Sequence, residues 1–183
     1  MATVYKTPGV YVEEIPKLPP SVAQVETAIP AFIGYTEKHE KNGESLFKKA
    51  KTVSSLAEFE AYFGKGPAVS YETYLDATDA VSQVVSSVPY CMYESLRLFY
   101  DNGGGKCYII SVGKYKSAAP FIDELSLTGA LGILEKEDEP TIIVCPDATR
   151  LSGVGLYNFQ KLALAQCAKL GDRVLLCDTF ISI

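Results

Sequence analysis

The sequence has no tryptophan, only one histidine, and fewer basic than acidic residues, with 17 lysines and arginines against 22 aspartates and glutamates. The net charge of −5 argues against nucleic acid as a partner, because phosphate binding needs clustered lysines and arginines. No stretch approaches the roughly 20 apolar residues that cross a bilayer, and the N-terminus lacks the basic-then-apolar pattern of a secretory signal. We therefore expect a cytosolic protein without direct membrane insertion.

The scarcity of histidine also restricts the catalytic chemistry that is open to the chain. Ser-His-Asp or Cys-His catalysis would depend on His39, which lies in the polar segment 37–43, where we expect a solvated side chain. The cysteines are odd in number, widely spaced and without a C-x-x-C pair, so we expect buried free thiols rather than disulfides or a zinc site. They are Cys91, Cys107, Cys145, Cys167 and Cys177. We expect no catalytic residue, metal or cofactor.

What is present is enough apolar material for a folded core. Hydrophobic residues make up 48% of the 183, which excludes a disordered chain. The length fits one well-buried domain, or one domain with an arm.

The stretch 90–113 changes hydrophobic period halfway along. Its first half has a stripe at helical spacing, which predicts an amphipathic helix. The stripe consists of Tyr93, Leu96 and Tyr100, widened by Met92 and Phe99. Asn102 and the glycines 103–105 tolerate positive φ and predict the end of this helix. The short apolar run 107–112 predicts a buried strand.

The sequence Asn-Gly-Gly-Gly-Lys at 102–106 invites comparison with a phosphate-binding loop. Such a loop follows a strand and opens a helix, whose exposed N–H groups hold the anion. Here the glycines follow a predicted helix, where carbonyl groups point outward. A helix end is therefore favoured over a phosphate site.

The first twenty residues do not resemble part of a compact core. Residues 7–9 predict a turn and the alternating segment 10–15 predicts a strand, after which prolines at 16, 19 and 20 exclude a helix. An isolated strand has unpaired N–H and C=O groups, so it needs a sheet edge. That edge belongs either to its own domain or to another subunit.

The remaining chain, residues 21–183, predicts an α/β domain. Buried strands are expected at 29–35, 141–145 and 173–178, and a capping box at Ser55 and Glu58 predicts a short helix that ends at Gly64. Further helices are expected at 127–135 and 156–170. Strand, helix and strand joined by short links imply a parallel crossover, so we predict a mixed sheet flanked by helices, with an extended N-terminal β-arm at 1–20. Residues 65–88 predict an insertion or a long excursion.

The strongest enzyme hypothesis concerns two aspartates that follow strands. Two predicted strands each end in Cys and Asp, at Cys145-Pro-Asp147 and Cys177-Asp178, and the carboxyl ends of parallel strands are where α/β enzymes bind ligands. The alternative function is therefore a small cytosolic α/β enzyme or ligand-binding domain. However, aspartate after a strand is common in turns and caps the helix that follows. No Gly-rich loop, base or metal set accompanies either residue, so a non-enzymatic role is favoured.

Four segments of the chain, in the same order, resemble the contractile tail sheath protein family, which coats myophage tails, R-type pyocins and related contractile injection systems. They are residues 7–16, 31–37, 95–112 and 139–147. The resemblance extends from Thr7 to Asp178 and is weak between residues 66 and 89.

This resemblance implies a structural subunit that forms stacked rings in a helical homo-oligomer around an inner tube protein, contacts baseplate and terminal cap proteins, and contracts to drive the tube through a target membrane. It implies assembly in the bacterial cytoplasm as part of a phage tail or injection particle. In the family, N-terminal and C-terminal arms pair with a sheet of a neighbouring subunit. The matching inter-subunit arm here consists of Tyr5, Thr7, Pro8, Gly9, Val10, Tyr11, Val12, Glu13, Glu14 and Ile15.

The chain departs from the family in length. Family members usually continue into a second half that completes the conserved domain and carries the other arm. We expect a truncated sheath subunit, or else a terminal or capping paralogue.

Overall fold

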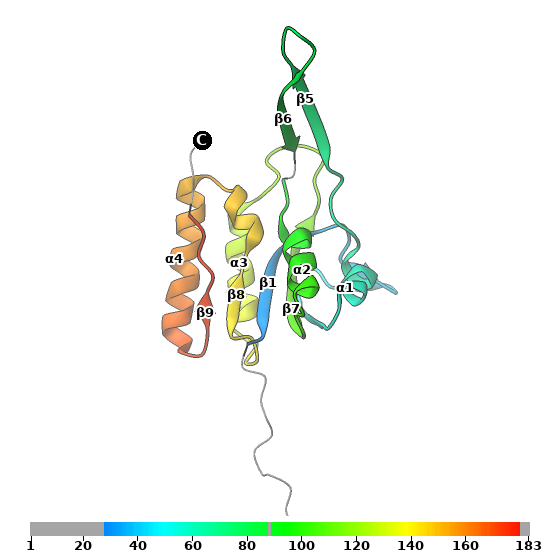
Figure 1. Cartoon of the computed structure of the whole chain (residues 1–183). Helices are drawn as coiled ribbons and strands as arrows, with labels where there is room; N and C mark the ends of the chain where they lie inside the picture. Colours follow the sequence, from blue (N-terminus) through cyan, green and yellow to red (C-terminus); the bar gives the residue numbers. More distant parts are fainter. Residues whose placement is uncertain (1–27, 88, 180–183) are drawn as a thin grey trace, which may run out of the picture.

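A computed structural model describes residues 28–87 and 89–179, whose centre is a five-stranded sheet in the order β4-β7-β1-β8-β9 (Figure 1). The strands are β4 (Ala50–Val53), β7 (Cys107–Lys114), β1 (Pro30–Thr36), β8 (Ile142–Val144) and β9 (Val174–Leu175). Strand β1 is parallel to β7 and β8, β8 is parallel to β9, and β4 is antiparallel to β7. The predicted mixed sheet is confirmed.

The two central strands are buried on both faces because their sequences are almost continuously apolar. Every residue of β1 is buried, and Ile33 lies beside Ile110 of β7 in the parallel register. Alternate residues of β1 serve two separate cores, since Ile33 packs on one face of the sheet and Phe32 on the other. This strand therefore joins the two halves of the hydrophobic core.

Helices cover both faces of the sheet. One core cluster joins the sheet to α3 (Glu124–Leu134) and α4 (Gly153–Leu170), through residues such as Leu127 and Phe159. The other joins it to α1 (Leu56–Phe63) and α2 (Met92–Asp101), through residues such as Phe59 and Leu96. A short 3-10 helix, η1 (Pro146–Arg150), follows β8. None of the helices in the described part of the chain has the length and apolar composition of a membrane span.

The helix ends lie where the local sequence signals predict. The Ser55 side chain accepts a hydrogen bond from the Glu58 amide at 3.1 Å, and α1 ends at Gly64. Helix α2 ends at Asn102, after which Gly103 has a φ of 83° and the Gly104 amide donates to the Phe99 carbonyl at 2.9 Å. The predicted helix, glycine stop and strand of 90–113 are thus confirmed.

Two hairpins lie outside the main sheet. The small one pairs β2 (Glu40–Lys41) with β3 (Glu44–Ser45). The larger pairs β5 (Ser70–Leu75) with β6 (Val81–Ser87), within the segment 65–88, and projects away from the body of the domain (Figure 1).

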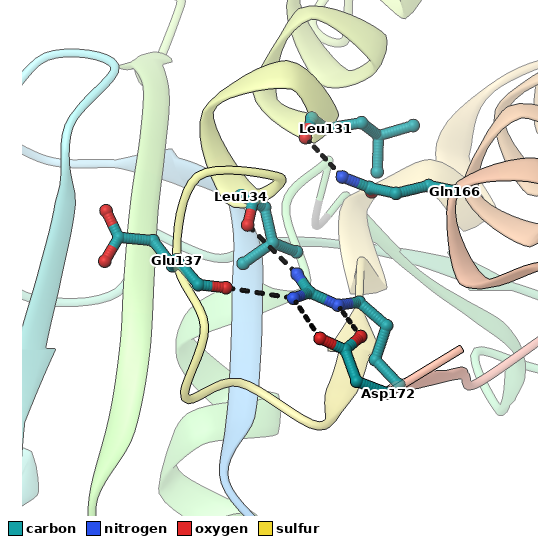
Figure 2. A network of polar contacts seen from close by, with 6 residues as sticks. Leu131, Leu134, Glu137, Gln166 and Asp172 are labelled. Atoms are coloured by element: carbon teal, nitrogen blue, oxygen red, sulfur yellow. Dashed lines mark hydrogen bonds and ion pairs between the residues drawn. The ribbon is translucent and has the colours of Figure 1, made fainter. Parts of the chain in front are cut away.

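The C-terminal end of α3 is bonded to the turn that joins α4 to β9. The buried Arg173 guanidinium donates to the carbonyls of Leu134 at 3.0 Å and Glu137 at 2.9 Å, and forms two hydrogen bonds with the carboxylate of Asp172 (Figure 2). Gln166 of α4 donates to the Leu131 carbonyl at 2.8 Å. The carbonyls of Leu131 and Leu134 also accept backbone hydrogen bonds from Glu135 and Glu137, so the two side chains bond to second acceptor positions and hold the end of α3 against α4 and the turn after it.

Candidate assembly surface

The residues predicted to form the inter-subunit arm lie outside the described part of the chain. They are Tyr5, Thr7, Pro8, Gly9, Val10, Tyr11, Val12, Glu13, Glu14 and Ile15. The pairing of this arm with a neighbouring subunit therefore stays a prediction. The described residues include the two aspartates of the enzyme hypothesis, of which one is buried and one is exposed. They also include a projecting hairpin and an apolar groove.

Asp147 is fully buried and bonds to two separate elements. Its Oδ2 accepts from the Tyr35 amide at 2.7 Å, at the carboxyl end of β1. Its Oδ1 accepts from the amides of Cys91 at 2.6 Å and Met92 at 3.1 Å, at the start of α2. The aspartate thus caps a helix, but this helix precedes it by 55 residues, so the expectation that it caps the following helix is wrong.

The electrostatics of Asp147 reflect this burial. Loss of solvent raises the pKa of its carboxyl to about 6, and the three backbone N–H donors counteract part of that rise. There is little room around the side chain, because a Cβ added to Gly34 would lie 2.6 Å from Oδ2 of Asp147. A closely packed carboxylate whose two oxygens are already bonded to the backbone fits a structural role.

Asp178 has different surroundings. It is exposed, and its backbone carbonyl accepts a hydrogen bond from Nε2 of Gln160 on α4 at 2.6 Å. The two aspartates therefore bond to different parts of the fold and share no polar partner among the described residues. Within residues 28–87 and 89–179, no group of three or more His, Cys, Asp or Glu side chains has an arrangement that holds a metal ion.

His39 differs from the sequence interpretation. It is half-buried, and its ring lies against that of Phe47 in a tilted arrangement with centroids 5.0 Å apart, so the prediction of a solvated histidine is wrong. Burial lowers its pKa, and the nearby charge of Lys114 adds to that effect. The cysteines are free as predicted, but only Cys107 and Cys145 are fully buried and Cys177 is exposed.

The hairpin β5–β6 has one apolar face. Side chains that pair directly across antiparallel strands lie on the same face, and Thr73 pairs with Val84. Tyr71 lies on this same face by alternation along β5. The register shifts between Tyr74 and Leu75, so this face is not continued to Leu75 and Val81. We call Tyr71, Thr73 and Val84 the apolar hairpin face. Tyr71 is 68% exposed and Val84 56%, so nothing in the described chain covers it.

The hairpin also has open edges. Neither β5 nor β6 pairs with a strand of the main sheet, so each offers one row of backbone N–H and C=O groups to a further strand. With 6 and 7 residues, these edges are much longer than that of β9, which has 2. Sequence reasoning missed this surface, because Tyr71, Tyr74 and Leu75 have the spacing of a helix start whereas the following run is β-branched and rich in serine, and these two signals conflict.

A second surface is an apolar groove of about 570 Å³ between α2 and β8. Its lining includes Pro30, Phe32, Leu98, Phe99, Ile142 and Val144, and Leu176 lies at the β9 side. Leu98 is 65% exposed and Leu176 60%. The sequence held one signal for this groove, since Leu98 is an apolar residue that lies outside the predicted stripe of α2.

Comparison with known proteins supports the fold. No family model matches the chain, and no curated protein matches it in sequence. Among solved structures, the chain is similar to the contracted helical sheath of the anti-feeding prophage (AFP), determined by cryo-EM, with a TM-score of 0.51 and 21% sequence identity. The similarity covers 98% of this chain and 41% of that chain. The domain therefore has the fold found in part of that sheath subunit.

Proposed function

We propose that this protein is a structural subunit of a contractile sheath, which polymerises around an inner tube and contracts to drive that tube through a target membrane. The observation that carries the proposal is the fold similarity to the contracted AFP sheath over 98% of this chain. The four sequence segments that resemble tail sheath proteins support it independently. Baseplate and terminal cap proteins are the further partners, and assembly takes place in the bacterial cytoplasm before the particle acts.

The contact proposed between subunits is strand addition by the N-terminal arm. Residues 10–15 predict a strand between a turn and prolines, so their backbone groups need a partner sheet. Among the edges of the described residues, those of the β5–β6 hairpin match this segment best in length. We therefore propose that the arm of one subunit adds to the hairpin of a neighbour, with main-chain hydrogen bonds supplying the affinity.

Contraction in this scheme needs no nucleotide. The subunit bodies rotate about the link around Pro16 to Pro20, while the arm stays paired. Each Å² of apolar surface that becomes buried on contraction contributes about 25 cal/mol, so a modest gain per subunit becomes large along a sheath. The exposed apolar hairpin face is available for such burial.

The experiment compares assembly of the full chain with that of a variant lacking residues 1–16. We expect the deletion variant to stay folded, with unchanged circular dichroism, and to form no sheath-like polymer by negative-stain electron microscopy. A point variant removes only the pairing, since Val12→Pro lacks the backbone N–H that a ladder needs, whereas Val12→Thr keeps it. Tubular polymers from the deletion variant, or equal assembly of the two Val12 variants, would contradict the arm.

A further inference from the structure

One face of the main sheet is only partly covered. Helices α1 and α2 pack over β4, β7 and β1, whereas on that side β8 contributes only the partly buried Val144 to the cluster and β9 contributes no residue to it. Ile142 and Val144 of β8 point to this side because Ile143 between them belongs to the other core. A parallel sheet is normally covered on both faces. The apolar groove is therefore a part of the sheet that the described residues leave incompletely covered.

The groove lies where the described chain begins. Ala28, the first described residue, lines it together with Pro30 at the start of β1. The 27 preceding residues are attached at this point, and only the seven residues 21–27 separate Ala28 from Pro20. Seven extended residues reach at most about 23 Å, so residues 16–20 stay close to the groove. Such a short tether gives them an effective concentration in the millimolar range.

The chemistry of the groove selects a proline-rich occupant. An ordinary extended segment would bury N–H groups against this almost wholly apolar lining, at a cost in free energy. Residues 16–20, Pro-Lys-Leu-Pro-Pro, lack three of these N–H groups and add one leucine. Proline-rich segments also bind grooves lined by aromatic rings, because their extended form is already ordered, and Phe32 and Phe99 lie here.

Charge complements the shape at one end of the groove. The groove includes Asn102 to Gly104, at the C-terminal end of α2, where the helix dipole is negative. The last turn of α2 contains no basic residue, and its last residue, Asp101, is acidic and exposed. Lys17 is the basic residue within the proline segment, and it complements this end of the helix.

We infer that residues 16–20 of the same chain bind in the apolar groove between α2 and β8, and so fix the direction in which the N-terminal segment leaves the domain. The bound segment covers Leu98 and Leu176 and completes the second face of the sheet. With residues 16–20 held in the groove, the link between arm and body narrows to the junction of Ile15 with Pro16. This inference concerns contacts within one chain and does not depend on the proposed function.

The test is disulfide trapping in the full-length chain, in a Cys177→Ser background that removes the exposed native thiol. Leu18→Cys is combined with Leu98→Cys in the groove. The matched control combines Leu18→Cys with Leu125→Cys, another exposed helix leucine, on α3. We expect mild oxidation to yield an intramolecular disulfide in the groove pair at least about fivefold faster than in the control pair, the factor that a modest binding preference produces.

A second variant tests the role of the prolines. Replacing residues 16, 19 and 20 by alanine restores their N–H groups and should slow formation of the groove disulfide by about fivefold. Trapping at the control rate would overturn the inference. Disulfide-linked dimers as the main product would overturn it as well, because they would place the segment of a neighbouring copy in the groove. Disulfide formation in the groove pair, in the control pair and in the proline variant is measured on non-reducing denaturing gels, whether or not the protein polymerises.

Discussion

Oδ2 of Asp147 lies 2.7 Å from the amide nitrogen of Tyr35, although the two residues are 112 positions apart in the sequence. Because the other carboxylate oxygen bonds to the first residues of α2, one side chain joins β1, α2 and the segment after β8. Met92 of α2 belongs to one core cluster, whereas Tyr35 of β1 and Ala148 of η1 belong to the other. Asp147 is thus placed to couple the two core clusters.

Removal of the Asp147 carboxylate should destabilise the domain. Asp147→Ala leaves two buried N–H groups and one partly buried N–H group without their acceptor, and each unpaired buried donor costs about 1–3 kcal/mol. Relief from burying a charge offsets part of this cost, so we expect a net loss of about 2 kcal/mol or more in the free energy of unfolding at pH 7. Urea denaturation measures it, with the exposed Asp178→Ala as control. Equal losses in the two variants would contradict the coupling role.

Stability should also depend on pH through Asp147. Its folded-state pKa of about 6 exceeds the ordinary value of 3.8, so the folded protein holds this proton more tightly than the unfolded chain does. The associated stabilisation is fully present below about pH 4 and is lost as the pH rises through 6. The full difference is about 3 kcal/mol. The unfolding free energy of wild type, measured relative to that of Asp147→Asn, should therefore fall by this amount between pH 4 and pH 7. A constant difference between the two proteins would contradict the prediction.

The hydrogen bonds of the Arg173 guanidinium should contribute more to stability than its positive charge alone. Arg173→Lys keeps the charge but cannot bond the carbonyls of Leu134 and Glu137 together with Asp172, so we expect a loss of about 1–3 kcal/mol by urea denaturation. The control is Lys169→Ala, which breaks the exposed ion pair with Glu135 and should cost less than about 1 kcal/mol. A smaller loss in Arg173→Lys than in the control would show that the network contributes little.

A charge on the apolar hairpin face should block assembly without unfolding the domain. Val84→Glu places a carboxylate on that face, whereas Gln83→Glu places it on the opposite face of the same strand. Both sites are exposed, so each change should alter the free energy of unfolding by no more than about 0.5 kcal/mol. Sedimentation and electron microscopy should show polymers only for Gln83→Glu. If both variants assembled alike, the apolar face would not be the contact.

Local signals predicted much of the fold, and long-range contacts account for what they missed. The cap at Ser55, the stop at Asn102 and the buried strand β7 follow from neighbouring residues, and each is present. The partner of Asp147 was not predictable, because sequence spacing does not show which helix lies beside a strand end. The hairpin at 70–87 was missed for a related reason: its apolar residues have no cover within the described chain, so no amphipathic pattern relates them to the domain core.

The position of β1 has a mechanical consequence. The N-terminal segment joins the domain at Ala28, directly before the middle strand, which is hydrogen-bonded to β7 on one side and β8 on the other. Tension along that segment would load both ladders in shear, so that several hydrogen bonds must break at once instead of one after another. A tether anchored in this way resists pulling better than one attached to an outer strand, as the proposed role in a contractile sheath would require.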